Sequence, residues 1–87
     1  MEELLGREVL SVKGRDRGKH YVVVEIIDAY FVRVADGEQK TVSSPKRKNK
    51  KHIVCTENLN PIPMDWTETK QGDDRIKQFL TNRKKEV

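Results

Sequence analysis

The stretch from Gly6 to Gly37 reads GREVLSVKGRDRGKHYVVVEIIDAYFVRVADG and decides the fold. Its apolar residues fall in three short runs, and a basic segment with two glycines separates the first run from the second. Short runs rich in valine and isoleucine, bounded by turn residues, are typical of β-strands. We therefore predict strands over Arg7–Val12, Tyr21–Ile27 and Tyr30–Ala35.

The second predicted strand, Tyr21–Ile27, carries the clearest strand signal. Three consecutive valines are followed, after Glu25, by two isoleucines. Such a run indicates burial on both faces, or a central strand of a small barrel. The first strand alternates instead, with Leu10 and Val12 on one face. Val9 falls on the opposite face, and we expect it to contact a later element and not the core.

The segment Lys13–Lys19 reads KGRDRGK and reverses the chain between the first two strands. Gly14 and Gly18 permit the positive φ angles that a tight turn requires. The segment has a single acid, Asp16, and four cations, which are Lys13, Arg15, Arg17 and Lys19. A local ion-pair network around Asp16 is one interpretation. Four cations exceed the charge that one carboxylate neutralises, so we predict that this turn contacts phosphate groups.

A hairpin and two further elements are predicted downstream. Asp36-Gly37 is a hairpin signal, and it leads to a short predicted strand over Gln39–Val42. The segment Ser43–Lys51, SSPKRKNKK, is predicted to be a loop because Ser-Ser-Pro ends the strand pattern. The apolar segment His52–Thr56 then predicts a fifth strand.

The basic run 46–51 lies within that predicted loop. Five of its six residues are cationic, namely Lys46, Arg47, Lys48, Lys50 and Lys51. One interpretation is a solvated tract or a localisation signal. Strands are predicted on both sides of the run, so we favour a clamp for phosphate groups.

The C-terminal third differs in character. The segment Asn58–Met64 contains two prolines, and we expect it to run extended over the barrel with Leu59 and Ile62 as anchors. Trp66 is the sole tryptophan, and core packing is the favoured interpretation over stacking on a base.

A helix is predicted over Asp73–Lys85. Asp73 or Asp74 would cap its N-terminus or favour the helix dipole there, and Lys84 and Lys85 would suit its C-terminus. Spacings of three and four residues place one apolar stripe on the helix, formed by Ile76, Phe79 and Leu80. We expect this stripe to pack on or near the barrel; a partner protein is the alternative.

Composition restricts the class of protein. The chain has 87 residues, of which 34% are hydrophobic and 37% are charged, so we expect one small domain. Its net charge of +4 arises entirely before Ile53, as expected for a polyanion-binding face. No apolar run approaches the roughly 20 residues that span a bilayer. With a single cysteine, Cys55, and an acidic N-terminus unlike a signal peptide, we expect a cytoplasmic protein without membrane contact.

Catalytic and metal-binding motifs are not recognisable in the sequence. Cys55, His20 and His52 lack the surroundings of a catalytic nucleophile and the spacing of metal ligands. The GRDRG turn lacks the length of a nucleotide-binding glycine loop. We therefore predict a binding module with no enzyme activity, no cofactor, no metal and no small-molecule substrate.

A family resemblance supports this interpretation. The strand Arg7–Gly14, the basic turn with Gly18, and the apolar strand Val22–Ile27 resemble a KOW motif. That motif is shared by several ribosomal proteins and by NusG-type transcription factors. Together with the basic loop, the His-Ile strand and the C-terminal helix, the chain up to Thr56 resembles the fourteen-e family of large-subunit ribosomal proteins. It departs from the family pattern at Asn49, which interrupts the basic run.

The resemblance implies an SH3-like β-barrel that binds structured RNA, with ribosomal RNA and ribosomal proteins as the expected partners. We predict a mainly β fold, in which residues 1–57 form a five-stranded SH3-like barrel of the KOW type. Residues 58–87 would form the proline-containing segment and a short C-terminal α-helix. The predicted RNA-binding residues are those of the two basic segments together with His20.

Two other functions remain open at this point. SH3-like barrels also bind peptides, and four aromatic residues would line such a groove: Tyr21, Tyr30, Phe31 and Trp66. An accessory role in transcription elongation would use the same RNA chemistry. The position of the aromatic residues discriminates the peptide-binding hypothesis from RNA binding.

Overall fold

The computed structural model describes residues 4–56, 61–63, 66 and 70–85. The fold is mainly β, with one antiparallel five-stranded sheet and a C-terminal helix, as predicted. The elements are β1 (Glu8–Ser11), β2 (His20–Ile26), β3 (Phe31–Ala35), β4 (Lys46–Asn49), the 3₁₀ helix η2 (Lys50–His52), β5 (Ile53–Cys55) and α1 (Lys70–Lys85). That helix, the longest among the described residues, lacks the length and apolar character to cross a bilayer.

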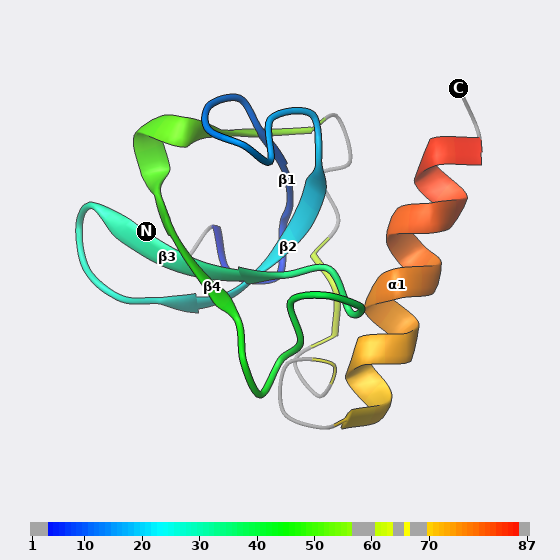
Figure 1. Cartoon of the computed structure of the whole chain (residues 1–87). Coiled ribbons are helices and arrows are strands. Elements are labelled where there is room, and N and C mark those ends of the chain that lie inside the picture. The colour runs from blue at the N-terminus through cyan, green and yellow to red at the C-terminus, as the bar shows by residue number, and fades with distance from the viewer. Residues whose placement is uncertain (1–3, 57–60, 64–65, 67–69, 86–87) are drawn as a thin grey trace.

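The sheet is strongly curled, but hydrogen bonds do not close it into a barrel. The strand order is β4-β3-β2-β1-β5, so β4 and β5 form its two edges. The helix η2 connects these edges along the chain (Figure 1). It is bonded to both sides of the sheet, because the Lys50 N–H donates to the Tyr30 carbonyl and the His52 carbonyl accepts from the Val12 N–H. The predicted closed barrel is therefore an open, curled sheet within the described residues.

Strand β2 is the centre of the sheet and is buried on both faces, as its sequence predicted. On the inner face, Tyr21 and Val23 belong to a core that includes Val32 and Val34. Val9 also belongs to this core and is completely buried, so its predicted position away from the core was wrong. The opposite face of β2 is covered by α1.

Helix α1 packs on the sheet through the predicted apolar stripe. Ile76 and Leu80 contact Val22 and Ile62, with Phe79 at the margin of this second cluster. Trp66 packs edge-on against Phe79, in agreement with the packing role predicted for it. The predicted anchor at position 59 lies outside the described residues.

The N-terminus of α1 lies three residues before the predicted start, and of the two roles predicted for Asp73 only a place near the positive end of the helix dipole is found. The helix begins at Lys70, so Asp73 lies inside its first turn and is not the N-cap. The Asp73 Oδ1 instead accepts a hydrogen bond of 2.8 Å from the Val42 N–H, a residue 31 positions earlier. The carboxylate thus joins the helix to the turn that follows β3.

Two local predictions between β3 and β5 were wrong. Gln39–Val42 is not a strand; the chain forms a tight turn there because Asp36 Oδ1 accepts from two N–H groups, those of Glu38 and Lys40. The basic run was predicted to be a loop, but its first four residues form β4, paired with β3. Four consecutive polar residues carry no apolar alternation, so the sequence pattern could not reveal this strand.

Candidate nucleic-acid interface

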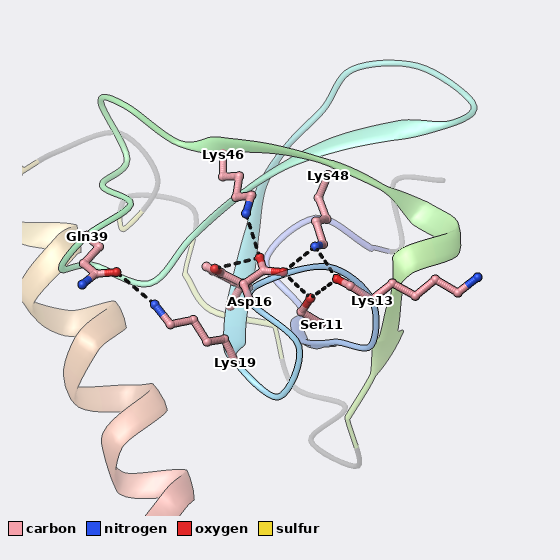
Figure 2. Close-up of polar contacts among 8 residues, drawn as sticks. Ser11, Lys13, Asp16, Lys19, Gln39, Lys46 and Lys48 are labelled. Carbon is pink, nitrogen blue, oxygen red and sulfur yellow. Dashed lines mark hydrogen bonds and ion pairs between the residues drawn. The ribbon is translucent and has the colours of Figure 1, made fainter.

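The carboxylate of Asp16 is the centre of the basic turn, and it is buried. Its Oδ1 accepts from the Lys48 ammonium at 2.7 Å and from the Ser11 hydroxyl at 2.8 Å. Its Oδ2 accepts from the Lys46 ammonium at 3.0 Å and from the Tyr21 hydroxyl at 3.0 Å. Figure 2 shows Lys46 and Lys48 reaching from β4 toward this one side chain. Both carboxylate oxygens therefore have two donors.

This arrangement changes the acid–base properties of two side chains. Burial by itself would raise the pKa of Asp16, but the hydrogen bonds from Lys48, Lys46, Ser11 and Tyr21 outweigh it and hold this pKa well below its usual range. Burial, and then the hydrogen bond to the Asp16 carboxylate, raise the pKa of Tyr21 above its usual range. Asp16 is therefore ionised, and Tyr21 is neutral, at neutral pH.

The two basic segments predicted from the sequence are adjacent, and two of their cations hold them together. Lys48 also donates to the Lys13 carbonyl at 3.1 Å, so β4 is tied to the backbone of the turn as well as to Asp16. The Lys48 side chain is only 7% exposed. We therefore remove Lys48 from the predicted RNA-binding residues, while Lys46 keeps about a third of its side chain exposed (35%).

The remaining cations of the turn point outward. Lys13, Arg15 and Arg17 are exposed, and within the described part of the chain their side chains form no ion pair. The Lys19 ammonium is also exposed and donates to Gln39 Oε1 at 3.0 Å. The local ion-pair network of Asp16 with its two arginine neighbours, the alternative interpretation of this turn, does not form among the described residues, because β4 supplies the partners of Asp16.

The two glycines of the turn have the positive φ angles predicted for them. Gly14 and Gly18 have φ angles of +92° and +94°, which L-residues with a Cβ rarely adopt. Around Gly18 no atom lies within 4 Å of the position that a Cβ would occupy. The backbone of the turn is thus open to the close approach of another molecule.

A second group of cations lies beside the turn, on the outer face of β4 and on η2. The Arg47 guanidinium is 4.5 Å from the centre of the Phe31 ring, on the face opposite to Lys46 and Lys48. Asn49, the interruption in the basic run, caps η2 by accepting from the Lys51 N–H at 2.9 Å. Lys50 is half-buried and Lys51 is exposed. The hydrogen bond from the Val12 N–H to the His52 carbonyl places η2 next to the start of the turn.

His20 lies at the margin of this surface. Its Nδ1 is 2.9 Å from Glu8 Oε2, and the ring is 28% exposed while the Glu8 side chain is buried. Among the described residues, no group of three or more His, Cys, Asp or Glu side chains is arranged to hold a metal ion.

The aromatic residues do not form the peptide groove considered above. Tyr21 is 1% exposed, with its hydroxyl bonded to Asp16. Phe31 stacks under Arg47, and Trp66 packs beside α1. Only Tyr30 is strongly exposed among these four residues, at 65%. Because the rings are scattered or buried, the hypothesis of an aromatic peptide-binding groove fails.

We did not predict from the sequence that Asp16 forms ion pairs with Lys46 and Lys48 and so connects the two basic segments. The signal was present in the Lys-Arg-Lys alternation at 46–48, because residues two apart share a face of a strand. A single acid in the turn and two lysines on one strand face form a complementary set. Recognising it required knowing that the run is a strand.

The sequence of the chain is similar to those of three curated proteins. No protein-family model matches the chain. Large ribosomal subunit protein eL14 from Pyrobaculum islandicum and from Pyrobaculum neutrophilum is 38% identical over 53 residues, which is 61% of this chain and 52% of each relative. The protein of the same name from Staphylothermus marinus is 39% identical over 49 residues, 56% of this chain and 51% of the relative.

The chain therefore spans about half the length of the curated relatives that it matches. The resemblance predicted from the KOW-like strands and turn is confirmed by these three proteins. Over the matched region, the chain is similar to large ribosomal subunit protein eL14.

Proposed function

We propose that this protein binds structured RNA of the ribosome through the phosphate groups of the RNA backbone. The contacts come from the exposed cations of the basic turn and from the exposed cations beside it, namely Lys13, Arg15, Arg17, Lys19, Arg47 and Lys51, with the half-buried Lys50 next to them. The observation that carries the proposal is the set of ion pairs at Asp16. The buried Lys48 and the half-buried Lys46 neutralise this carboxylate, so the exposed cations of the turn, Lys13, Arg15 and Arg17, are not used to neutralise it.

The geometry suits a rigid phosphate-binding surface. The turn is held by hydrogen bonds to Asp16 from Ser11, Tyr21 and β4, so its exposed side chains start from a fixed backbone. Arg15 and Arg17 can each grip a phosphate with two N–H groups, whereas the lysines act as point charges. The open backbone at Gly18 allows a phosphate to approach closely. Lys46 supplies supporting charge at the margin, and His20 lies there with its Nδ1 2.9 Å from Glu8 Oε2.

The names of the relatives agree with this proposal, because all three are large ribosomal subunit proteins. We infer the same setting for this chain: a non-catalytic role in translation within the cytoplasm, with ribosomal RNA and neighbouring ribosomal proteins as partners. Residues 1–57 would carry the RNA contacts, while residues 58–87 would support the sheet.

The salt dependence of binding tests the phosphate contacts. If about five phosphates are neutralised, log K for isolated large-subunit ribosomal RNA should fall against log salt with a slope of roughly −3.5 to −4.5. Replacing two exposed cations of the turn, in the variant R15Q/R17Q, should reduce the magnitude of the slope by roughly 1.4 to 1.8. Circular dichroism would verify that the variant is folded.

The matched control removes the same charge from α1. In R75Q/K77Q the two exposed cations lie on α1, where Arg75 is over the Trp66 ring and Lys77 is paired with Glu38. Because Lys77 lines a pocket together with Lys19 and His20, the slope should change, but by less than in R15Q/R17Q. Equal slopes for R15Q/R17Q and the parent protein would reject the assignment. Co-sedimentation with RNA polymerase and not with ribosomes would favour the elongation role instead.

A further inference from the structure

Tyr30 is the most exposed large hydrophobic side chain among the described residues, at 65%. It lies in the turn between β2 and β3, one residue before β3 begins. An exposed aromatic ring gains nothing for the fold, because burial is what makes such a ring stabilising. The ring is therefore accessible to a ligand.

The backbone holds Tyr30 in place. The Tyr30 and Phe31 N–H groups both donate to Asp28 Oδ1, at 2.7 and 2.9 Å. The Tyr30 carbonyl accepts from the Lys50 N–H at 2.9 Å, which joins the turn to η2. The ring therefore projects from a turn whose N–H and carbonyl are both bonded, so little backbone entropy is lost when a ligand binds.

Cations are found on the segments next to Tyr30. The bond from the Lys50 N–H places the Tyr30 backbone beside η2, and the exposed Lys51 follows Lys50 in that helix. The Arg47 guanidinium lies over the ring of Phe31, the residue that follows Tyr30. The helix η2 also touches the basic turn through Val12, so it lies between that turn and the Tyr30 turn (Figure 1). The phosphate-binding surface proposed above thus extends to Tyr30.

The nearby acids offset only part of this positive charge. Asp28 accepts from two backbone N–H groups and interacts electrostatically with Lys50 and Arg47, while Glu25 is paired with Arg33 at 3.0 Å. A rigid, exposed ring within a cationic surface is complementary to a ligand that has an anionic backbone and flat apolar faces. Nucleic acid with an unpaired base meets that description.

We propose that Tyr30 stacks on an unpaired base of the bound RNA while Arg47 and Lys51 contact the phosphates beside that base. This inference rests on the proposed RNA-binding function and adds a preference for RNA with a bulged or looped-out nucleotide. Two other rings beside the basic turn have contacts of their own: Tyr21 is buried with its hydroxyl bonded to Asp16, and His20 is paired with Glu8.

Two RNA probes and three variants test the inference. The probes are a 20-base-pair RNA duplex with a single bulged adenosine and the same duplex without the bulge. Y30A should weaken binding to the bulged duplex at least about fivefold, the lower end of the effect of losing one base–aromatic stack. It should leave binding to the plain duplex within about twofold. Y30F retains the ring and should bind both probes like the parent protein.

The control variant is V54A, which removes the other exposed large hydrophobic side chain of the described residues, on edge strand β5. It should change neither affinity. The salt slope of Y30A should equal that of the parent protein, because no charge is removed.

The outcomes separate this inference from the proposed function. Unchanged binding of Y30A to the bulged duplex, or equal weakening on both duplexes, would overturn the stacking site. Either result is compatible with the RNA-binding surface itself, provided that R15Q/R17Q still reduces the salt slope. If the parent protein binds neither probe, and R15Q/R17Q leaves the slope on ribosomal RNA unchanged, both proposals fall.

Discussion

The Lys48 ammonium lies 2.7 Å from the Asp16 carboxylate, and both side chains are more than nine-tenths buried. The two residues are 32 positions apart, so this ion pair fastens β4 onto the basic turn. A buried charge is costly unless it is paired and hydrogen-bonded, and here Lys46, Ser11 and Tyr21 complete the set around the carboxylate. Lys48 therefore stabilises the fold, although the preceding residue, Arg47, is exposed to solvent.

Replacing Lys48 should be strongly destabilising. In K48M the stem of the side chain is kept, but Asp16 loses its shortest ion pair and remains buried with a single ammonium partner. Removing one partner of a buried pair costs about 3 kcal/mol or more of the free energy of unfolding. Urea denaturation followed by circular dichroism would measure this loss.

The exposed pair of Arg33 and Glu25 offers the control for that measurement. Both side chains are close to half exposed, so R33Q should change the free energy of unfolding by less than about 1 kcal/mol. If K48M and R33Q unfold at the same urea concentration, the buried pair is not a structural joint.

The stability of the protein should fall in acid, in part through Asp16. Its pKa is depressed in the folded state, so below about pH 5 the unfolded chain, with a carboxyl pKa near 3.8, binds more protons. The stabilisation from Asp16 is complete above that unfolded value and is lost as the pH falls toward the folded pKa. D16N has no such proton to bind. The difference in unfolding free energy between the parent protein and D16N should therefore shrink from pH 5 to pH 2.

Urea midpoints at intervals across that range would reveal the trend. The other carboxyl groups titrate in both proteins, so their contributions to the unfolding free energy cancel to first order in the difference between the parent protein and D16N. Parallel stability curves for the parent protein and D16N would contradict a depressed pKa for Asp16.

Two glycines with similar backbone angles should respond differently to alanine. Gly37 has φ of +80°, and a Cβ there would collide with the carbonyl oxygen of Asp73 in α1. At Gly18 the same addition meets open space, so the cost is the left-handed backbone alone, about 1 to 2 kcal/mol. G37A should therefore destabilise the protein more than G18A, because helix α1 must also shift.

Thermal unfolding of the two variants provides the comparison, and hydrogen exchange would locate the effect. Amide protons in α1 should exchange faster in G37A than in G18A. Equal melting temperatures for the two variants would show that the contact with α1 has no energetic weight.

The hydrogen bond between Asp73 and Val42 predicts a difference between two neighbouring acids. D73A leaves the Val42 N–H without its partner and should cost about 1 kcal/mol of the free energy of unfolding, whereas D73N keeps an acceptor oxygen and should recover most of it. D74A, at an exposed position of the same helical turn, should have little effect. Similar losses for D73A and D74A would point to the helix dipole and not to this bond.

Local patterns were sufficient for much of the fold. The β-branched run in β2, the glycines of the basic turn and the apolar stripe of α1 each act over a few residues, and each was predicted. The start of α1 was misplaced because Asp73 has the chemistry of a cap but is used in a long-range bond. Val9 was misplaced because an alternating strand does not itself state which face is buried.

What the sequence by itself determined is the central strand with its basic, glycine-bracketed turn, and the positive charge of the first 52 residues. Only the tertiary structure decided which cations remain at the surface. A lysine has the same chemistry at positions 46, 48 and 51, but Lys46 and Lys48 lie on the Asp16 side of β4, whereas Lys51 lies on η2 and is exposed. Lys48 became part of the interior because a buried carboxylate lies opposite it, and that partner comes from a segment 32 residues away. A pattern that covers only a few neighbouring residues cannot predict a pair between residues so far apart in the chain.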